Sequence, residues 1–238
     1  MNAFQHISAY FRFVNEYRRF KALATADLRF PVQWKNRNAF LKEKTARSGF
    51  DRHYIYHTAW AARMVRQANP AFHVDISSSL YFSSIVSAFV PVRFYEFRPP
   101  DLVLSNLSTD SADLLALPFE SISVASLSCM HVVEHAGLGR YGDPLNPSAD
   151  LAAIAELKRV LAPAGSLLFV VPLGKPLVRF NSHRIYSYGQ IVDYFKGLTL
   201  AHYAFIPEFF SDGPMVEDPP RETRDCGLEG CGCFMFTK

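Results

Sequence analysis

Two histidines and a glutamate lie close together in the stretch HVVEH, at residues 131–135. Their spacing matches the H-x-x-E-H string of one class of zinc peptidases, in which two histidines on a helix bind zinc and the glutamate acts as a base. Here the string follows a predicted strand and precedes a glycine-rich loop, so a long helix is not expected. We predict no metal site. We expect His131, Glu134 and His135 at the edge of a sheet, where one of them orients or deprotonates an acceptor.

Two further segments carry groups that suit polar ligands. His183 follows another predicted strand and is a second candidate base, although a histidine that caps an element or fills the core is an equally good interpretation. The loop at 137–142 places glycines around Arg140 and Tyr141. This loop either cradles an anion with its backbone N–H groups or forms a tight structural connection in which Arg140 pairs with Asp143. It lacks the lysine of a phosphate-binding P-loop.

The four cysteines do not have the spacing of a metal site. Cys226, Cys231 and Cys233 cluster near the end of the chain, but zinc usually takes four ligands from pairs separated by two to four residues. We therefore expect free thiols there and a buried thiol at Cys129. So few cysteines in 238 residues, together with no recognisable secretory signal, favour a cytoplasmic location.

Short apolar runs alternate with helical patterns along most of the chain, and this alternation is typical of a mostly parallel sheet covered by helices on both faces. Ligands of such sheets bind at the carboxyl ends of the strands. Asp51 is expected to cap a helix at 52–68, and Ser187 and Gln190 form a capping box before a later helix. The predicted strands are 72–76, 92–97, 102–106, 122–130, 166–172, 199–206 and 233–238. The other predicted helices are 77–89 and 149–162.

Residues 1–50 differ in charge from the rest of the chain. They contain ten Lys and Arg against three Asp and Glu, whereas residues 51–238 contain 15 against 19. Helical spacing at 8–23 places Phe13, Tyr17 and Phe20 on one face, which we expect to pack against the domain or against a second copy of the chain in a homo-oligomer. There are two alternatives to this packing. The basic helix makes peripheral contact with an anionic membrane, or its charged face is simply solvated.

The composition excludes several other classes of protein. Hydrophobic residues make up 49% of the chain and 34 residues are aromatic, which excludes disorder. No apolar run reaches the roughly 18 residues of a transmembrane helix. Because the sequence has neither an RNA-recognition motif nor a helix-turn-helix signature, we do not expect nucleic acid as a partner.

Several motifs, taken in order, resemble class I S-adenosylmethionine-dependent methyltransferases. They are DLLALPF at 113–119, ELKRVLAPAGSLLFVVP at 156–172 and HRIYSYGQIVDYF at 183–195. The stretches EHAGLGRYGDPLNP at 134–147 and PLGKPLVRFNSHRIY at 172–186 look closer still to a branch of that fold known only as a domain of unknown function. The resemblance covers residues 51–238 and leaves 1–50 as a basic helical extension. It implies an α/β, Rossmann-like, doubly wound sheet of seven mostly parallel strands, of which the last runs antiparallel.

The resemblance also assigns residues to the cofactor, S-adenosylmethionine. Glu96 would accept hydrogen bonds from the ribose hydroxyls, and Asp113 and Leu114 would lie against the adenine. The methionine part would face the turn after the first strand, where family members carry glycines. The residues of this turn that we assign to the cofactor are Asp75, Ser77, Ser78 and Ser79.

Two functions follow from this resemblance. The first is transfer of a methyl group to an oxygen or nitrogen of a small-molecule or carbohydrate-type acceptor, the acceptor class being suggested by Tyr141, Asn181, His183 and Tyr186. The second is a catalytically inactive methyltransferase fold that serves as a binding or scaffolding module, because serine at 77–79 replaces glycine, which lets the backbone approach a ligand closely.

Overall fold

The computed structural model describes residues 3–24, 30–221, 224–225 and 227–238. The chain divides into two compact units, Met1–Phe50 and Asp51–Lys238. Among the described residues, no helix combines the length and the apolar character that crossing a bilayer requires.

The described part of the N-terminal unit contains a long helix and a short 3-10 helix. Helix α1 (Ala3–Leu23) starts earlier than the predicted residue 8, and η2 spans Trp34–Asn36. The rings of Phe13 and Tyr17 lie 6.2 and 4.8 Å from the Trp34 ring, so two of the three predicted apolar residues pack within this unit. Phe20, the third, is 61% exposed.

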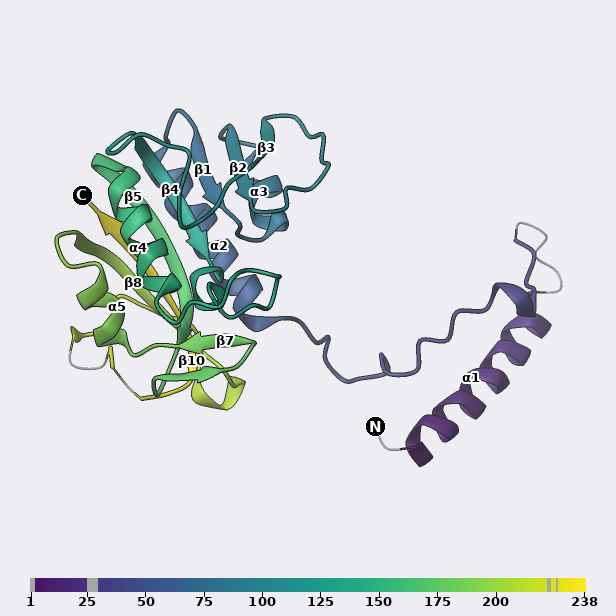
Figure 1. Ribbon diagram of the computed structural model, residues 1–238. Coiled ribbons are helices and arrows are strands. Elements are labelled where there is room, and N and C mark those ends of the chain that lie inside the picture. The colour runs from purple at the N-terminus through teal and green to yellow at the C-terminus, as the bar shows by residue number, and fades with distance from the viewer. Residues whose placement is uncertain (1–2, 25–29, 222–223, 226) are drawn as a thin grey trace. The chain divides into compact units, whose positions relative to one another are not determined.

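The second unit is built on one eight-stranded sheet with the order β3-β2-β1-β4-β5-β10-β8-β9 (Figure 1). Strands β1 to β5 pair in parallel, whereas β10 is antiparallel to both of its neighbours. This confirms the predicted Rossmann-like sheet with an antiparallel last strand, and the two-residue β9 adds an eighth strand at the edge. The strands are β1 (His73–Ile76), β2 (Val92–Glu96), β3 (Leu107–Ser111), β4 (Val124–Met130), β5 (Leu161–Leu173), β8 (Thr199–Pro207), β9 (Val216–Glu217) and β10 (Gly230–Thr237).

Helices cover both faces of the sheet, as the alternating pattern predicts (Figure 1). Helices α2 (Arg52–Ala68) and α3 (Leu80–Val86) bury Trp60 and Phe82 against one face. Helices α4 (Ala149–Val160) and α5 (Tyr188–Tyr194) bury Leu157 and Ile191 against the other. Burial of two apolar faces, at about 25 cal/mol per Å², is what stabilises such a sheet.

The capping predictions at Asp51 and at Ser187 are confirmed, whereas Ser148, the N-cap residue of α4, makes no side-chain capping bond. Asp51 accepts a hydrogen bond from the Tyr54 backbone N–H at the start of α2. Ser187 and Gln190 form both halves of the capping box before α5. Each cap satisfies N–H groups that the first helical turn leaves without an internal partner.

The predicted third strand is displaced. Strand β3 begins at Leu107 rather than at residue 102, because Asn106 adopts a positive φ of 58° and the chain turns between Leu104 and Leu107. The apolar run that suggested a strand is on the surface, with Val103 96% exposed. Helix α3 is also shorter than predicted: it starts at Leu80, because Ser77 has a left-handed backbone that cannot continue a helix.

Besides η2 and β9, the described residues form further short elements that were not predicted. A two-stranded hairpin, β6 (Leu177–Arg179) and β7 (His183–Ile185), follows β5, and the 3-10 helix η3 (Val133–His135) follows β4. The 3-10 helix η4 (Phe210–Asp212) comes after β8. The hairpin and η3 both lie beside the carboxyl end of the sheet, where they add side chains to its edge (Figure 1).

Candidate functional site

The carboxyl ends of the central strands share one edge of the sheet. Ser77 follows β1 and His131 follows β4, and the two strands are neighbours. Because β10 runs antiparallel, its beginning rather than its end lies at this edge, and Cys231 pairs with Pro172 near the end of β5. Residues from distant parts of the sequence therefore meet here.

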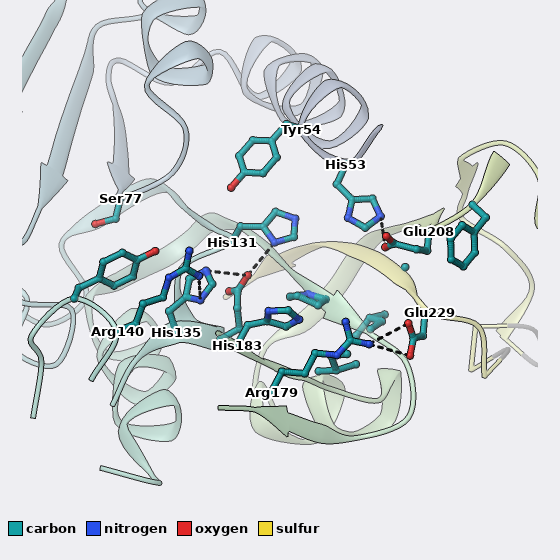
Figure 2. A pocket seen from close by; sticks show the side chains of 17 residues that line it. His53, Tyr54, Ser77, His131, His135, Arg140, Arg179, His183, Glu208 and Glu229 are labelled. Carbon is teal, nitrogen blue, oxygen red and sulfur yellow. Dashed lines mark hydrogen bonds and ion pairs between the residues drawn. The ribbon is translucent and has the colours of Figure 1, made fainter. Parts of the chain in front are cut away.

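A pocket of about 740 Å³ opens at this edge (Figure 2). Four of the eight histidines of the chain line it, and the pocket wall also contains both acidic and basic groups. The predicted catalytic residues His131, Glu134, His135 and His183 are all among the lining residues. The charged lining residues besides Glu134 are Arg140, Arg179, Glu208 and Glu229.

His131 is held between two buried partners. Its Nδ1 lies 2.9 Å from Glu134 Oε1, and its Nε2 lies 3.3 Å from Cys231 Sγ. Burial alone lowers the pKa of the His131 imidazole, but Cys231 and the Glu134 carboxylate outweigh this and hold it well above its ordinary value. Burial raises the pKa of the Cys231 thiol well above its ordinary value, although His131 acts in the opposite direction.

His135 is oriented differently from His131. The two residues do not share a helix, since η3 is a single 3-10 turn, so the zinc-peptidase arrangement does not form. His135 Nδ1 lies 2.6 Å from the Ser182 carbonyl oxygen, which assigns the proton to Nδ1 and leaves the lone pair on Nε2. That Nε2 lies 3.9 Å from Glu134 Oε1.

Glu134 is 1% exposed and lies between these two histidines. Its Oε2 is buried without a hydrogen-bond partner in the part of the chain that the structure describes. His183 is more exposed than Glu134 and lies 2.8 Å from the Ser182 hydroxyl. Burial lowers the pKa of His183, which favours its neutral form.

The glycine-rich loop after η3 is a structural connection. Asp143 accepts the Gly139 and Tyr141 backbone N–H groups instead of pairing with Arg140, so N–H groups that an anion would need are already used. Gly137 has a φ of +73°, and a Cβ there would lie 2.1 Å from the Asn146 carbonyl oxygen, so only glycine fits.

Arg184, on β7, holds the glycine-rich loop through hydrogen bonds to its backbone. Its guanidinium donates to the carbonyl oxygens of Ala136 at 2.6 Å and Pro147 at 3.1 Å. It also lies 3.6 Å from the Asp150 carboxylate, and both side chains are buried. Arg184 therefore fixes the loop that carries Glu134 and His135.

Asp75, predicted to face the cofactor, is fully buried behind the pocket wall. Its carboxylate accepts hydrogen bonds from the Ser128 hydroxyl at 2.6 Å and from the Ser83 hydroxyl. Burial raises the pKa of Asp75 to about 6, although the serine hydroxyls act in the opposite direction. Asp75 therefore links β1 to β4 and α3, and it is not among the residues that line the 740 Å³ pocket.

The serine turn keeps the backbone shape of a glycine turn. Ser77 has a φ of +55°, in the left-handed region, and both its N–H and its hydroxyl donate to the Tyr95 carbonyl oxygen. The Ser78 hydroxyl accepts the Met130 N–H at 3.0 Å. Ser79 is the N-cap residue of α3 but makes no side-chain capping bond. Of the three serines, Ser77 lines the pocket.

The remaining predicted cofactor residues follow the neighbouring strands. Glu96 ends β2 next to Ser77, because Ile76 pairs with Tyr95. Asp113 comes shortly after β3 and accepts the Leu115 N–H at 2.8 Å, while Leu114 packs on the core. These three residues are not among those that line the 740 Å³ pocket.

Sequence reasoning missed the contribution of α2 to the site. His53 and Tyr54, in its first turn, line the pocket, and the His57 ring lies 5.0 Å from the His131 ring. The available signal was the spacing of His53 and His57, which puts both on one face of a helix whose start was correctly predicted.

Comparison with solved structures identifies the fold. One similar structure is the 1,6-didemethyltoxoflavin-N1-methyltransferase of Burkholderia thailandensis with bound 1,6-didemethyltoxoflavin and S-adenosylhomocysteine. The two structures have a TM-score of 0.53 and 10% sequence identity, and the match covers 76% of this chain and 78% of that one. Another is the N-methyltransferase NodS of Bradyrhizobium japonicum in complex with S-adenosylhomocysteine. Here the TM-score is 0.52 at 12% identity, and the match covers 76% of this chain and 85% of that one. At these identities the likeness establishes the fold, which is that of the class I methyltransferases.

Sequence comparison adds one match. Residues 119–211 match the sequence profile of a protein family described as "Caenorhabditis protein of unknown function, DUF268". This segment includes η3, the glycine-rich loop and the β6–β7 hairpin, and it contains all four predicted catalytic residues, His131, Glu134, His135 and His183. No curated protein matches the chain in sequence.

Proposed function

We propose that the protein is an S-adenosylmethionine-dependent methyltransferase that acts on an oxygen or nitrogen of a small-molecule or carbohydrate-type acceptor. One observation carries this proposal: a single pocket runs from Ser77, at the turn after β1, to His135 and His183. In this fold the turn after β1 is the place of the cofactor's methionine part. The pocket therefore joins that place to a set of histidines suited to holding an acceptor.

The residues at the strand ends fit the cofactor. The left-handed backbone at Ser77 is the conformation for which glycine is used in this turn. The Ser77 hydroxyl donates to the Tyr95 carbonyl oxygen and the Ser78 hydroxyl accepts the Met130 N–H, so both are bonded within the protein. Glu96 and Asp113 supply carboxylates at the ends of the next two strands. When bound, S-adenosylmethionine supplies an electrophilic methyl group on a sulfonium.

His135 is the candidate general base. Its Nδ1–H is fixed on the Ser182 carbonyl oxygen, so Nε2 is free to accept a proton from an acceptor hydroxyl or amine. The Glu134 carboxylate, 3.9 Å away, stabilises the imidazolium that results. The remaining contribution of the chain is to orient the acceptor and to exclude water.

The pocket wall favours a polar acceptor. Tyr54 and Tyr141 offer aromatic faces with hydroxyl groups, and Arg140 and Arg179 offer hydrogen-bond donors. Such a combination suits a hydroxylated or carbohydrate-type molecule better than an apolar one.

The alternative proposal is a binding or scaffolding module that keeps the fold without catalysis. Its support is the absence of glycine from the turn at 77–79, where a Cβ reduces the clearance for a cofactor.

Ser77→Gly tests whether the serine turn reduces the clearance for the cofactor. We expect this change to leave the affinity for S-adenosylhomocysteine unchanged or to raise it, because clearance increases. The free energy of unfolding should change by no more than about 1 kcal/mol, since relief of the left-handed strain offsets the greater entropy of glycine in the unfolded chain. Calorimetric titration and denaturant unfolding measure the two quantities.

Ser78→Gly is the matched control for stability. It removes the hydroxyl that accepts the buried Met130 N–H, and should cost about 1–3 kcal/mol. Tight binding by the wild type that Ser77→Gly abolishes contradicts both proposals, because the serine hydroxyl would then be the essential ligand.

A turnover assay tests the proposed function. The full chain is incubated with S-adenosylmethionine and pools of hydroxylated, amino and sugar-type acceptors, and S-adenosylhomocysteine is quantified by mass spectrometry. We expect its release to depend on the acceptor pool. Cofactor binding without turnover in any pool supports the scaffolding alternative.

A further inference from the structure

Three side chains from distant parts of the chain converge on the pocket wall. They are His53 from the first turn of α2, His131 after β4 and Cys231 at the start of β10. One ring nitrogen of each histidine and the cysteine Sγ all lie within 4.8 Å of one another. Zinc bond lengths impose separations of about 3.3–3.8 Å between ligand atoms in a tetrahedral site, so small side-chain rotations complete the geometry. We propose that His53, His131 and Cys231 bind a zinc ion.

Buried polar atoms without partners provide independent support. His53 Nε2 makes no hydrogen bond to any described residue, but it lies 3.4 Å from Glu208 Oε2, with which it forms an ion pair when the imidazole is protonated. Glu134 Oε2 and His57 Nε2 are likewise buried and unpartnered within the described chain. Leaving such groups unsatisfied costs about 1–3 kcal/mol each, and more for a carboxylate. A zinc ion held by His53 and by His131, whose Nδ1 is bonded to Glu134, would compensate part of that cost.

The surroundings of His131 match those of a metal ligand. A metal-binding histidine usually donates its second ring N–H to a carboxylate, which fixes the ring and increases the basicity of the ligating nitrogen. His131 Nδ1 is bonded in this way to Glu134 Oε1, while Nε2 faces Cys231. The thiolate formed on binding and the Glu134 carboxylate together balance the two charges of the ion.

The donor set indicates zinc and an open fourth position. Two imidazoles and one thiolate are borderline-soft ligands that suit zinc. His53 and His131 line the pocket whereas Cys231 does not, so the remaining coordination position faces the pocket. Three protein ligands with one open position are characteristic of catalytic rather than structural zinc. The ion would therefore contact a water or an acceptor oxygen.

Cys231, His131 and Glu134 are also arranged in the order of a Cys-His-Glu nucleophilic triad. We favour the metal because the Cys231 side chain is completely buried, and an attacking sulfur must reach its substrate. The sequence-based expectation of no zinc considered His131 only with His135, and Cys231 only with other cysteines. Cys233, its neighbour on β10, is also buried, and Cys226 lies outside the described residues.

The zinc proposal is independent of methyl transfer and is tested by metal binding alone. The full chain is freed of metal with a chelator under reducing conditions, then titrated with zinc in competition with a chromophoric chelator. We expect one zinc per chain. Cobalt serves as the spectroscopic probe, because a Cys231 thiolate on cobalt gives a ligand-to-metal charge-transfer band in the near ultraviolet.

Variants identify the ligands. Cys231→Ser should remove the charge-transfer band, and His53→Gln should weaken zinc binding more than Glu134→Gln does. Glu134→Gln, which removes only the support for His131, should weaken it by about 10- to 100-fold. His183→Gln, from the same pocket, is the control and should retain wild-type affinity. Circular dichroism verifies that each variant is folded.

Two results overturn the proposal. One is that the wild-type chain takes up no zinc, or that the folded variants Cys231→Ser and His53→Gln bind zinc with the same affinity as the wild type. The other is rapid alkylation of Cys231 by iodoacetamide at a rate that zinc does not slow, which would favour the nucleophilic triad.

Discussion

Arg184→Met should lower the free energy of unfolding by about 3–5 kcal/mol, because it leaves the buried Asp150 carboxylate without its cationic partner. The change also removes the donors to the Ala136 and Pro147 carbonyl oxygens, which hold the loop after η3. Tyr186, which donates to Asp150 at 3.0 Å, remains as a weaker partner. Denaturant unfolding of the purified variant measures the loss.

Arg179→Met is the matched control on the adjacent strand of the same hairpin. Arg179 pairs with Glu229 at 3.4 Å, but both side chains are about half exposed. Exposed ion pairs contribute about 0–1 kcal/mol, so this variant should unfold close to the wild type. Equal losses for the two variants would show that Arg184 is not the anchor of the site.

His135→Asn should reduce the rate of methyl transfer by about 10²- to 10⁴-fold, the range that a positioned general base contributes. The asparagine side chain cannot accept a proton as imidazole does. Because His135 is bonded to the Ser182 carbonyl oxygen rather than to the core, the fold should be retained. The measurement is kcat with an acceptor that supports turnover, together with a thermal unfolding curve.

His202→Asn provides the comparison for that experiment. His202 is an exposed histidine on β8, paired with Asp218 at 3.0 Å and not among the pocket-lining residues. Its substitution should leave kcat unchanged. A kcat for His135→Asn within about twofold of the wild type would mean that the acceptor loses its proton without this base.

Local sequence signals located most of the fold. The Asp51 cap, the capping box at Ser187 and the buried β-type runs each depend on neighbours within a few residues, so the sequence displays them directly. The error at 102–106 has the same local origin. An apolar run looked like a strand, and the left-handed Asn106 that ends the turn carries no unambiguous signal.

The sequence predicts the part of the site whose residues directly follow a single strand. His131, Glu134 and His135 follow β4 directly, so their place at the sheet edge could be read from the sequence. The approach of His53 and Cys231 could not, because it requires the position of α2 and the antiparallel direction of β10. The burial of Asp75 was not predictable either: the family position predicts ligand contact, whereas in the structure the buried carboxylate accepts hydrogen bonds from two serine hydroxyls.

Binding of S-adenosylhomocysteine, measured by isothermal titration calorimetry, tests the central claim most directly. We expect the wild-type chain to bind one equivalent. Glu96→Ala should weaken binding, because it removes the carboxylate proposed to hold the ribose hydroxyls at the end of β2. Glu120→Ala, an exposed position outside the predicted cofactor residues, should bind as the wild type does. Absence of binding by the folded wild type, or equal binding by Glu96→Ala, would contradict the proposed cofactor site.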